Sequence, residues 1–216
     1  MRTARLSAIL LLLPLVVFGR ETAYQALRVV GKQRSQTQLN QVIEIKARNG
    51  TPQPAAWTLL LNDPMARGGV RELEVVSGHI VSERTPVKTG ANGKTFSLAK
   101  LNLDSEGAFA VAEHEARVVK LGFYGANYTL CADPASDTPV WVLHLLDKDQ
   151  NPIASVTIAA DTGQVISKTF SGHETKGSWS AGGGLKGRLQ RFGDAVGNSF
   201  RNAGDRIQDF WDGGSR

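Results

Sequence analysis

Few side chains in this sequence combine the residue types and spacing that site chemistry requires. A glycine pattern at residues 182–187, GGGLKG, matches the one that binds dinucleotide phosphates at the start of a helix. It follows a Gly/Ser-rich stretch rather than a strand, and too little chain remains after it for a βαβ unit. Glu113, His114 and Glu115 lack the second histidine of a zinc-protease motif. We therefore expect neither a nucleotide site nor a zinc site.

The remaining histidines and carboxylates also form no catalytic pattern. No histidine has cysteine or histidine companions at metal-ligand spacing, and no serine lies in a nucleophile elbow. Asp63 and Asp147 each follow a tryptophan by a few residues and precede a proline, so they are interpreted as turn residues rather than a catalytic pair. The sequence thus predicts no catalytic residue, no metal site and no cofactor, and we expect a protein that is not an enzyme.

Cys131 is the single cysteine of the chain, which excludes an intramolecular disulfide. Cysteine is among the most buried residue types, so Cys131 is predicted to be a core residue of a strand. A reactive thiol is the alternative.

The N-terminus has the features of a secretory signal peptide. Arg2 and Arg5 precede an apolar run from Leu6 to Phe18, and Gly19 completes a small-residue cleavage pattern. The run is too short to cross a hydrocarbon core of ~30 Å as a helix. We predict a signal peptide over residues 1–19 and a periplasmic or secreted mature protein; an uncleaved N-terminal anchor is the alternative.

Composition sets limits on the partners of the mature protein. The formal charge of +5 includes Arg2 and Arg5 of the predicted signal peptide, and no run of Lys and Arg is interleaved with aromatic residues. The remaining basic excess is too weak to predict nucleic-acid binding. A hydrophobic fraction of 41% supports a packed core, in one domain or two small ones.

Two parts of the chain resemble each other. Arg28-Val29-Val30 has a counterpart in residues 117–119, and the strand-like segments that begin at Trp57 and Trp141 share their pattern. Gly78 and Gly163 end the two parts at nearly the same spacing from the tryptophans. Several matches in the same order predict a duplication, with one unit over residues 20–85 and a second over residues 104–168.

Each unit is predicted to contain a helix followed by antiparallel strands. The first helix is expected from Glu21 to Val30; the second is capped at Asp104 or Ser105 and ends at Gly122. Apolar residues alternate after both Trp57 and Trp141, which predicts strands with one buried face. The return strands are expected to kink at Gly78 and Gly163. The predicted fold class is α+β, with two duplicated helix-plus-sheet units.

The end of the second unit resembles the PepSY family. Residues 156–166, with Asp161, Thr162 and Gly163, follow a Trp-bearing apolar strand and a polar hairpin. The resemblance covers residues 105–167 well and residues 21–82 more weakly, and it departs from the family at Ala159, where aspartate is frequent. It implies tandem PepSY-like repeats in an envelope protein and a protein-binding role, of the kind associated with inhibition of peptidases. The family shares no catalytic residues.

The C-terminal segment differs in composition. Residues 169–184 form a Gly/Ser-rich linker, and residues 185–212 are predicted to form an amphipathic helix. This helix is expected to fold back on the body, to lie on a membrane surface or to pair with a partner helix. The apolar residues expected to dock it are Leu189, Phe192, Val196, Phe200, Ile207, Phe210 and Trp211.

Together these patterns predict an exported, non-enzymatic envelope protein that binds a protein or peptide, with a peptidase as one candidate partner. The alternative function is a membrane-surface or self-assembling structural protein that acts through its C-terminal helix.

Overall fold

The computed structural model describes residues 20–86 and 93–170. In the first half of this part, the elements are α1 (Ala23–Gln33), α2 (Gln36–Leu39), β1 (Val42–Gly50), β2 (Trp57–Asn62), β3 (Val70–Val76) and β4 (His79–Arg84). In the second half, they are the 3-10 helix η1 (Leu98–Lys100), α3 (Ser105–Val118), β5 (Gly125–Ala132), β6 (Pro139–Leu146), β7 (Pro152–Ala159) and β8 (Val165–Phe170).

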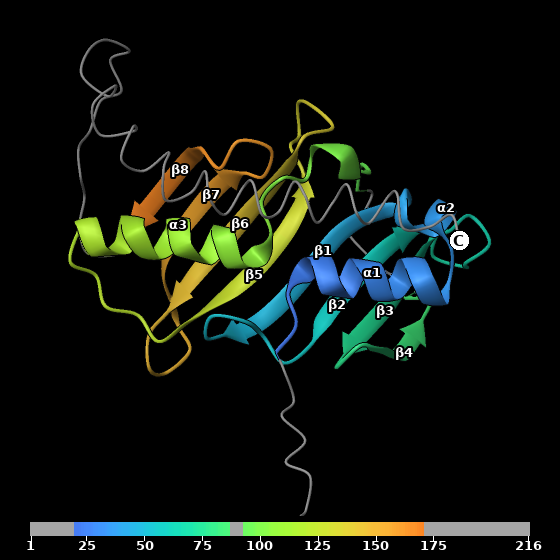
Figure 1. Ribbon diagram of the computed structural model, residues 1–216, viewed down its shortest axis with the longest axis horizontal. Helices are drawn as coiled ribbons and strands as arrows, with labels where there is room; N and C mark the ends of the chain where they lie inside the picture. Colours follow the sequence, from blue (N-terminus) through green and yellow to red (C-terminus); the bar gives the residue numbers. More distant parts are fainter. Residues whose placement is uncertain (1–19, 87–92, 171–216) are drawn as a thin grey trace, which may run out of the picture.

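All eight strands belong to one antiparallel sheet in the order β4-β3-β2-β1-β5-β6-β7-β8 (Figure 1). The two sets of four strands join through β1 and β5, where Glu44 lies opposite Cys131 and Ala47 lies opposite Tyr128. The prediction of an α+β fold with two PepSY-like units is therefore wrong: the described chain is a single, mostly β structure. Pairing satisfies the backbone groups of two strands that would otherwise be sheet edges, and side-chain periodicity does not reveal such pairing.

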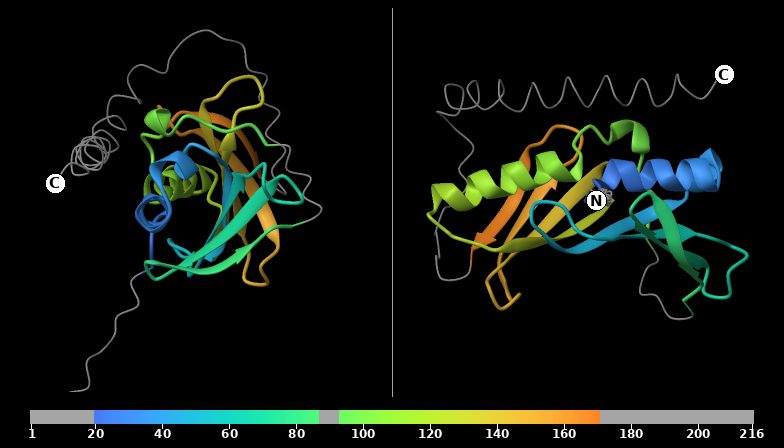
Figure 2. Two further views of the ribbon diagram at one scale, coloured as in Figure 1. Left: turned by 90° about the vertical axis from the view of Figure 1, so that its right-hand side faces the viewer. Right: turned by 60° about the horizontal axis from the view of Figure 1, so that its bottom comes forward.

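The two longer helices lie on the same face of the sheet, which curves around them (Figure 2). The N-cap of α1 is Thr22, which forms a capping box with Gln25, and the N-cap of α3 is Asp104. No helix of the described residues covers the opposite sheet face. Successive side chains of each strand point to opposite faces of the sheet, and those that face the helices are buried.

The tryptophans occupy corresponding places in the two sets of strands. Trp57 in β2 donates its indole N–H to the carbonyl of Glu21 at 2.8 Å, and Trp141 in β6 donates to the carbonyl of Leu103 at 2.8 Å. Both carbonyls immediately precede the N-cap of a helix. The rings contact each other edge to face with centroids 6.3 Å apart, and both pack against Tyr128. Each tryptophan thus ties one helix to the shared core.

Several local predictions need correction. The first helix runs from Ala23 to Gln33 and is followed by the short α2, because Ser35 provides a second N-cap. The return strands do not kink at Gly78 and Gly163 but reverse into separate strands, β4 and β8. Both glycines have a positive φ, of 78° and 73°, which a tight turn between strands requires.

Some predicted segments lie outside the described residues: the signal peptide over residues 1–19 and the amphipathic helix over residues 185–212. The predicted linker over residues 169–184 lies mostly outside as well, and its first two residues, Thr169 and Phe170, belong to β8. Within residues 20–86 and 93–170, no helix is long and apolar enough to cross a membrane.

Candidate functional site

An open groove of about 580 Å³ lies between α3, the loop that follows it, and the loop between β1 and β2. Its volume falls within the range of small-molecule and peptide side-chain pockets. Apolar and aromatic side chains predominate, with charged residues among them. The lining residues are Thr51, Pro52, Phe109, Glu113, Arg117, Lys120, Leu121, Gly122, Phe123 and Tyr124.

The loop on one side of the groove begins with a Schellman motif at the end of α3. Leu121 donates its backbone N–H to the carbonyl of Ala116 at 2.9 Å, and Lys120 donates to the carbonyl of Arg117 at 3.0 Å. Lys120 takes the left-handed conformation, with φ of 57°, that glycine favours at this position. The predicted stop at Gly122 is therefore wrong by two residues, and the reversal directs residues 121–124 along the helix.

Aromatic rings form the floor and one side of the groove. Phe109 contacts Phe123 edge to face at a centroid distance of 5.6 Å and stacks on Tyr128 at 6.5 Å. Tyr124 is 70% exposed, although its backbone N–H is held by the carbonyl of Leu146 at 2.8 Å. An exposed aromatic ring on an anchored backbone is a preformed contact surface.

Thr51 and Pro52 form the opposite wall, which two side chains, those of Tyr128 and Arg20, hold in place. The hydroxyl of Tyr128 donates to the Pro52 carbonyl, and Arg20 donates to the Thr51 hydroxyl at 2.6 Å and to the Thr51 carbonyl at 3.2 Å. Gly50 lets the wall approach the core, because a Cβ there would lie 2.6 Å from the ring of Tyr128 and 2.9 Å from the Pro52 carbonyl. The wall is therefore built against Tyr128 and carries a cation, Arg20, beside it.

The rim of the groove has a positive excess. Arg117 pairs with Glu113 at 3.3 Å, one turn away on the exposed surface of α3. Among the described residues, no acid forms an ion pair with Lys120. With Arg20 bound to Thr51 beside the wall, this arrangement can hold an apolar side chain on the floor and a carboxylate at the rim.

The corresponding place beside α1 is filled by the chain itself. Leu39 of α2 packs onto Gly31, where a Cβ would lie 2.8 Å from the Leu39 side chain. The segment before α3 adds Phe96, which is 4% exposed and belongs to the core. Only a smaller pocket of about 300 Å³ remains there, lined by Asn40, residues 95–99 and Asp137. The groove beside α3 has no such filling from the described residues.

The residues predicted from sequence lie elsewhere. Trp57 and Trp141 are buried, and Gly78 and Gly163 form turns, so all four have structural positions. The seven predicted docking residues of the C-terminal helix lie outside the described part of the chain. The groove itself was missed. Its one signal in the sequence is the apolar run Leu121-Gly122-Phe123-Tyr124 directly after a helix end.

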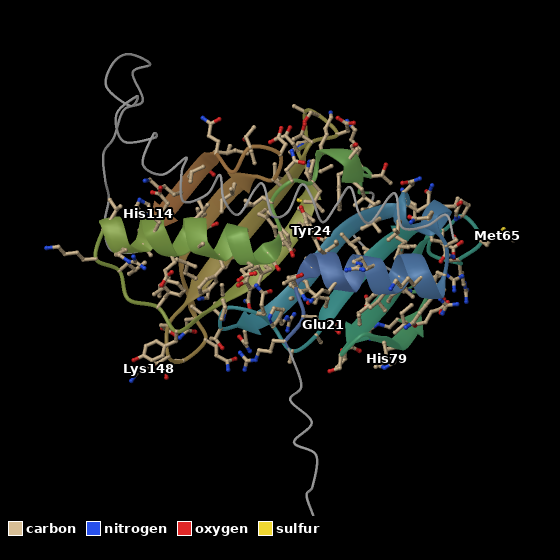
Figure 3. All side chains as sticks on the ribbon, in the orientation of Figure 1. Glu21, Tyr24, Met65, His79, His114 and Lys148 are labelled. Carbon is tan, nitrogen blue, oxygen red and sulfur yellow. The ribbon has the colours of Figure 1, made fainter. Side chains whose placement is uncertain are left out.

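The described residues contain no group of three or more His, Cys, Asp or Glu side chains that could hold a metal ion. His79 and His114 lie in different halves of the structure (Figure 3). Cys131 is half-buried in β5 rather than fully in the core, and burial, assisted by the negative charge of Glu44, raises the pKa of its thiol. A raised pKa keeps the thiol protonated and weakly nucleophilic.

Asp63 and Asp147 lie in separate hairpins, at opposite ends of the antiparallel β1–β5 pair. Asp63 accepts a hydrogen bond from the backbone N–H of Met65, and Asp147 accepts from those of Asp149 and Asn151. Both therefore stabilise turns.

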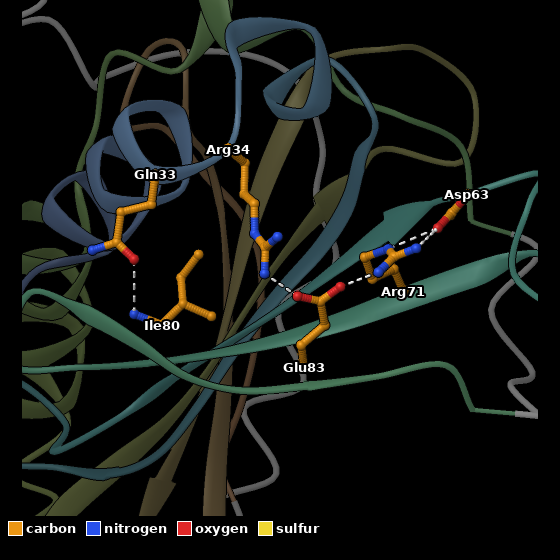
Figure 4. Close-up of polar contacts among 6 residues, drawn as sticks. All are labelled: Gln33, Arg34, Asp63, Arg71, Ile80 and Glu83. Carbon is orange, nitrogen blue, oxygen red and sulfur yellow. Dashed lines mark hydrogen bonds and ion pairs between the residues drawn. The ribbon is translucent and has the colours of Figure 1, made fainter.

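Asp63 also belongs to a chain of ion pairs at the β4 edge (Figure 4). Arg71 bridges Asp63 and Glu83, and Arg34 at the end of α1 contacts Glu83. Beside them, the Gln33 side chain donates to the Gly78 carbonyl at 3.2 Å and accepts from the Ile80 N–H at 3.4 Å. Gln33 thus occupies the Ile80 N–H of the edge strand β4 and a carbonyl of the turn before it, which protects this end of the edge from pairing with another chain.

No family model matches this chain, and no curated protein matches it. Among solved structures, it is similar to a candidate lipoprotein from Clostridium difficile 630, at 11% sequence identity and a TM-score of 0.49. The alignment covers 69% of this chain and 93% of the other.

Proposed function

We propose that this protein is an exported, non-enzymatic binding protein that takes a peptide segment of a partner protein into the groove beside α3. One observation carries the proposal: the groove is open, whereas the corresponding place beside α1 is filled by Leu39 and Phe96. Beside α1, this arrangement of elements holds apolar side chains of the protein itself. We infer that the corresponding groove beside α3 holds apolar side chains of a partner.

The chemistry of the lining supports a peptide rather than a small polar metabolite. Phe109, Phe123 and the exposed Tyr124 offer aromatic contact area with little side-chain entropy to lose. Charged groups lie at the rim, where they set orientation and specificity more than affinity. The export that the proposal includes is supported by the basic, apolar and small-residue series over residues 1–19.

A displayed library of random dodecapeptides, selected on the mature protein that begins at Arg20, tests the proposal. We expect enriched peptides to lose at least about tenfold in affinity, or about 1.4 kcal/mol, for Tyr124→Ala. Met65→Ala is the matched control, because Met65 is an apolar side chain that is 91% exposed and lies in the hairpin between β2 and β3, away from the groove (Figure 3). The proposal fails if no peptide is enriched, or if enriched peptides bind the Tyr124→Ala protein as well as the parent.

A further inference from the structure

Residues 95–100, which fill the place beside α1, indicate the kind of peptide that the open groove would bind. In residues 95–100, TFSLAK, the Phe96 side chain enters the core and Ser97 donates its backbone N–H to the carbonyl of Asp137 at 3.0 Å. Lys100 then pairs with the Asp137 carboxylate at 2.6 Å. The buried Phe96 is the main apolar anchor of this segment, and the partly buried Leu98 also packs against the core. One backbone hydrogen bond and one ion pair hold the segment to the same loop.

The open groove has the same frame. Asp137 lies in the loop between β5 and β6, and the corresponding loop between β1 and β2 supplies Thr51 and Pro52 to the groove wall. The end of α3 and the loop after it take the place of α1 and α2. A peptide in the groove would therefore run between the same kinds of elements as residues 95–100 do.

The charges, however, are opposite. The loop between β5 and β6 presents Asp137 to a lysine, whereas the loop between β1 and β2 has no charged residue of its own. The charges around the open groove are cations: Arg20, which donates to Thr51 of the wall, and Arg117 and Lys120 on the rim across from it. The one acid of the lining, Glu113, is paired with Arg117. Lys120 keeps a side chain at a left-handed position that glycine would occupy with less strain, and this residue lines the groove.

We infer that the partner segment carries a large apolar side chain followed, four residues later, by a carboxylate. The spacing is that of Phe96 and Lys100, and the carboxylate replaces the lysine because the receiving charges are inverted. This inference rests on the proposed function and specifies the chemistry of its ligand.

Three hexapeptides test the inference, each acetylated and amidated so that no terminal charge contributes: TFSLAE, TFSLAK and TASLAE. Each is titrated into the isotope-labelled mature protein while the amide shifts of residues 120–124 are followed. We expect TFSLAE to bind about fivefold more tightly than TFSLAK, as a solvent-accessible ion pair provides, and TASLAE to bind at least tenfold more weakly than TFSLAE. An Arg117→Glu/Lys120→Glu protein should reverse the order of TFSLAE and TFSLAK.

The outcomes separate this inference from the proposed function. If TFSLAK binds as well as TFSLAE in the groove, the function stands and the inferred carboxylate is wrong. If no hexapeptide shifts residues 120–124 and the library yields no groove-dependent peptide, both fail. Groove shifts that depend on protein concentration alone would show a second copy as the occupant, and shifts caused by Phe200→Asp would show the C-terminal segment; either result overturns the inference.

Discussion

The carboxylate of Asp104, the N-cap of α3, accepts a hydrogen bond at 3.1 Å from the backbone N–H of Tyr24 in the first turn of α1. Ser105, the first residue of α3, binds α1 in the same way: its hydroxyl accepts a hydrogen bond from the backbone N–H of Ala23 at 3.1 Å. The two helices therefore meet at their N-termini, where Tyr24 lies (Figure 3), and residues of α3 satisfy donors of α1 that lack partners within their own helix.

Replacement of Asp104 tests this shared cap. We expect Asp104→Ala to lower the free energy of unfolding by about 2–3 kcal/mol, because it removes the cap of α3 and leaves the part-buried N–H of Tyr24 in α1 unpaired. Ser35→Ala, which affects the cap of α2 alone, should cost about 1 kcal/mol. Urea denaturation measures both values, and equal costs for the two variants would contradict the shared cap.

Asp104→Asn is the conservative partner of that variant. Burial raises the pKa of Asp104 above its ordinary value, against the lowering effect of its hydrogen bonds with Thr22, Ser105 and Tyr24. A neutral amide keeps an acceptor oxygen in the same place, so Asp104→Asn should cost less than half as much as Asp104→Ala in the same urea experiment.

Removal of the Trp141 indole should cost about as much as a large truncation in a core. Trp141 is fully buried and its N–H binds the Leu103 carbonyl. We expect Trp141→Ala to lower the free energy of unfolding by roughly 3–5 kcal/mol. Trp141→Phe retains most of the apolar area and should lose only about 1–3 kcal/mol, for the unsatisfied carbonyl. Thermal and urea unfolding followed by circular dichroism provide the values; a Phe variant as unstable as the Ala variant would contradict this division.

Asp63 should titrate at low pH. Its hydrogen bond with Arg71 lowers its pKa below the ordinary value, with smaller lowering effects from backbone N–H groups. A depressed pKa in the folded state means that the stabilisation is present above the ordinary pKa of about 4 and is lost as the pH falls through the folded pKa. Carboxyl NMR titration should show the Asp63 midpoint move up toward the ordinary value in Arg71→Gln. An unchanged midpoint would show that Arg71 is not the cause.

Cys131 should react slowly in the folded protein. Burial and the nearby Glu44 raise the pKa of its thiol, so the thiolate fraction at pH 8 is smaller than for a free cysteine. We expect iodoacetamide to modify native protein at least about tenfold more slowly than urea-denatured protein. Glu44→Gln should speed the native reaction modestly, whereas Glu72→Gln, as a control in β3, should leave the rate unchanged.

The left-handed backbone at Lys120 predicts an unusual gain from glycine. Lys120→Gly should raise the free energy of unfolding by about 0.5–1 kcal/mol, because glycine adopts a positive φ without the Cβ clash. Lys120→Ala removes the same charge but keeps a Cβ, so it should not stabilise. An equal gain from both variants, measured by urea denaturation, would show that charge rather than backbone strain is relieved.

Local features of the fold could be predicted where a side chain acts on its own segment. The cap at Asp104 and the strands that begin near Trp57 and Trp141 all occur where their patterns are strongest. The predicted helix end at Gly122 was wrong because Lys120 takes the left-handed position that glycine usually takes. The predicted kinks at Gly78 and Gly163 were wrong because glycine favours a kink within a strand and a tight turn between two strands alike. Sequence patterns identify that a turn occurs more reliably than they identify its geometry.

The groove could not be predicted, because its residues come from three segments with no pattern in common. Phe109 is one apolar residue of a helix, Pro52 is a loop proline, and Tyr124 precedes a strand. Each is ordinary in its own segment. Their proximity follows from the antiparallel pairing of β1 with β5, which brings the loop at the end of β1 beside the residues that lead into β5.

The sequence by itself determined the buried and exposed faces of the strands, the start of α3 and the absence of a recognisable catalytic motif, because periodicity and capping depend on neighbours within a few residues. The tertiary structure alone decided that all eight strands form one sheet, that two helix N-termini share Asp104, and that an open groove lies beside α3. Strand pairing is a contact between backbone groups distant along the chain, and backbone groups are the same in every residue except proline, so no local pattern of side chains specifies which edges will meet.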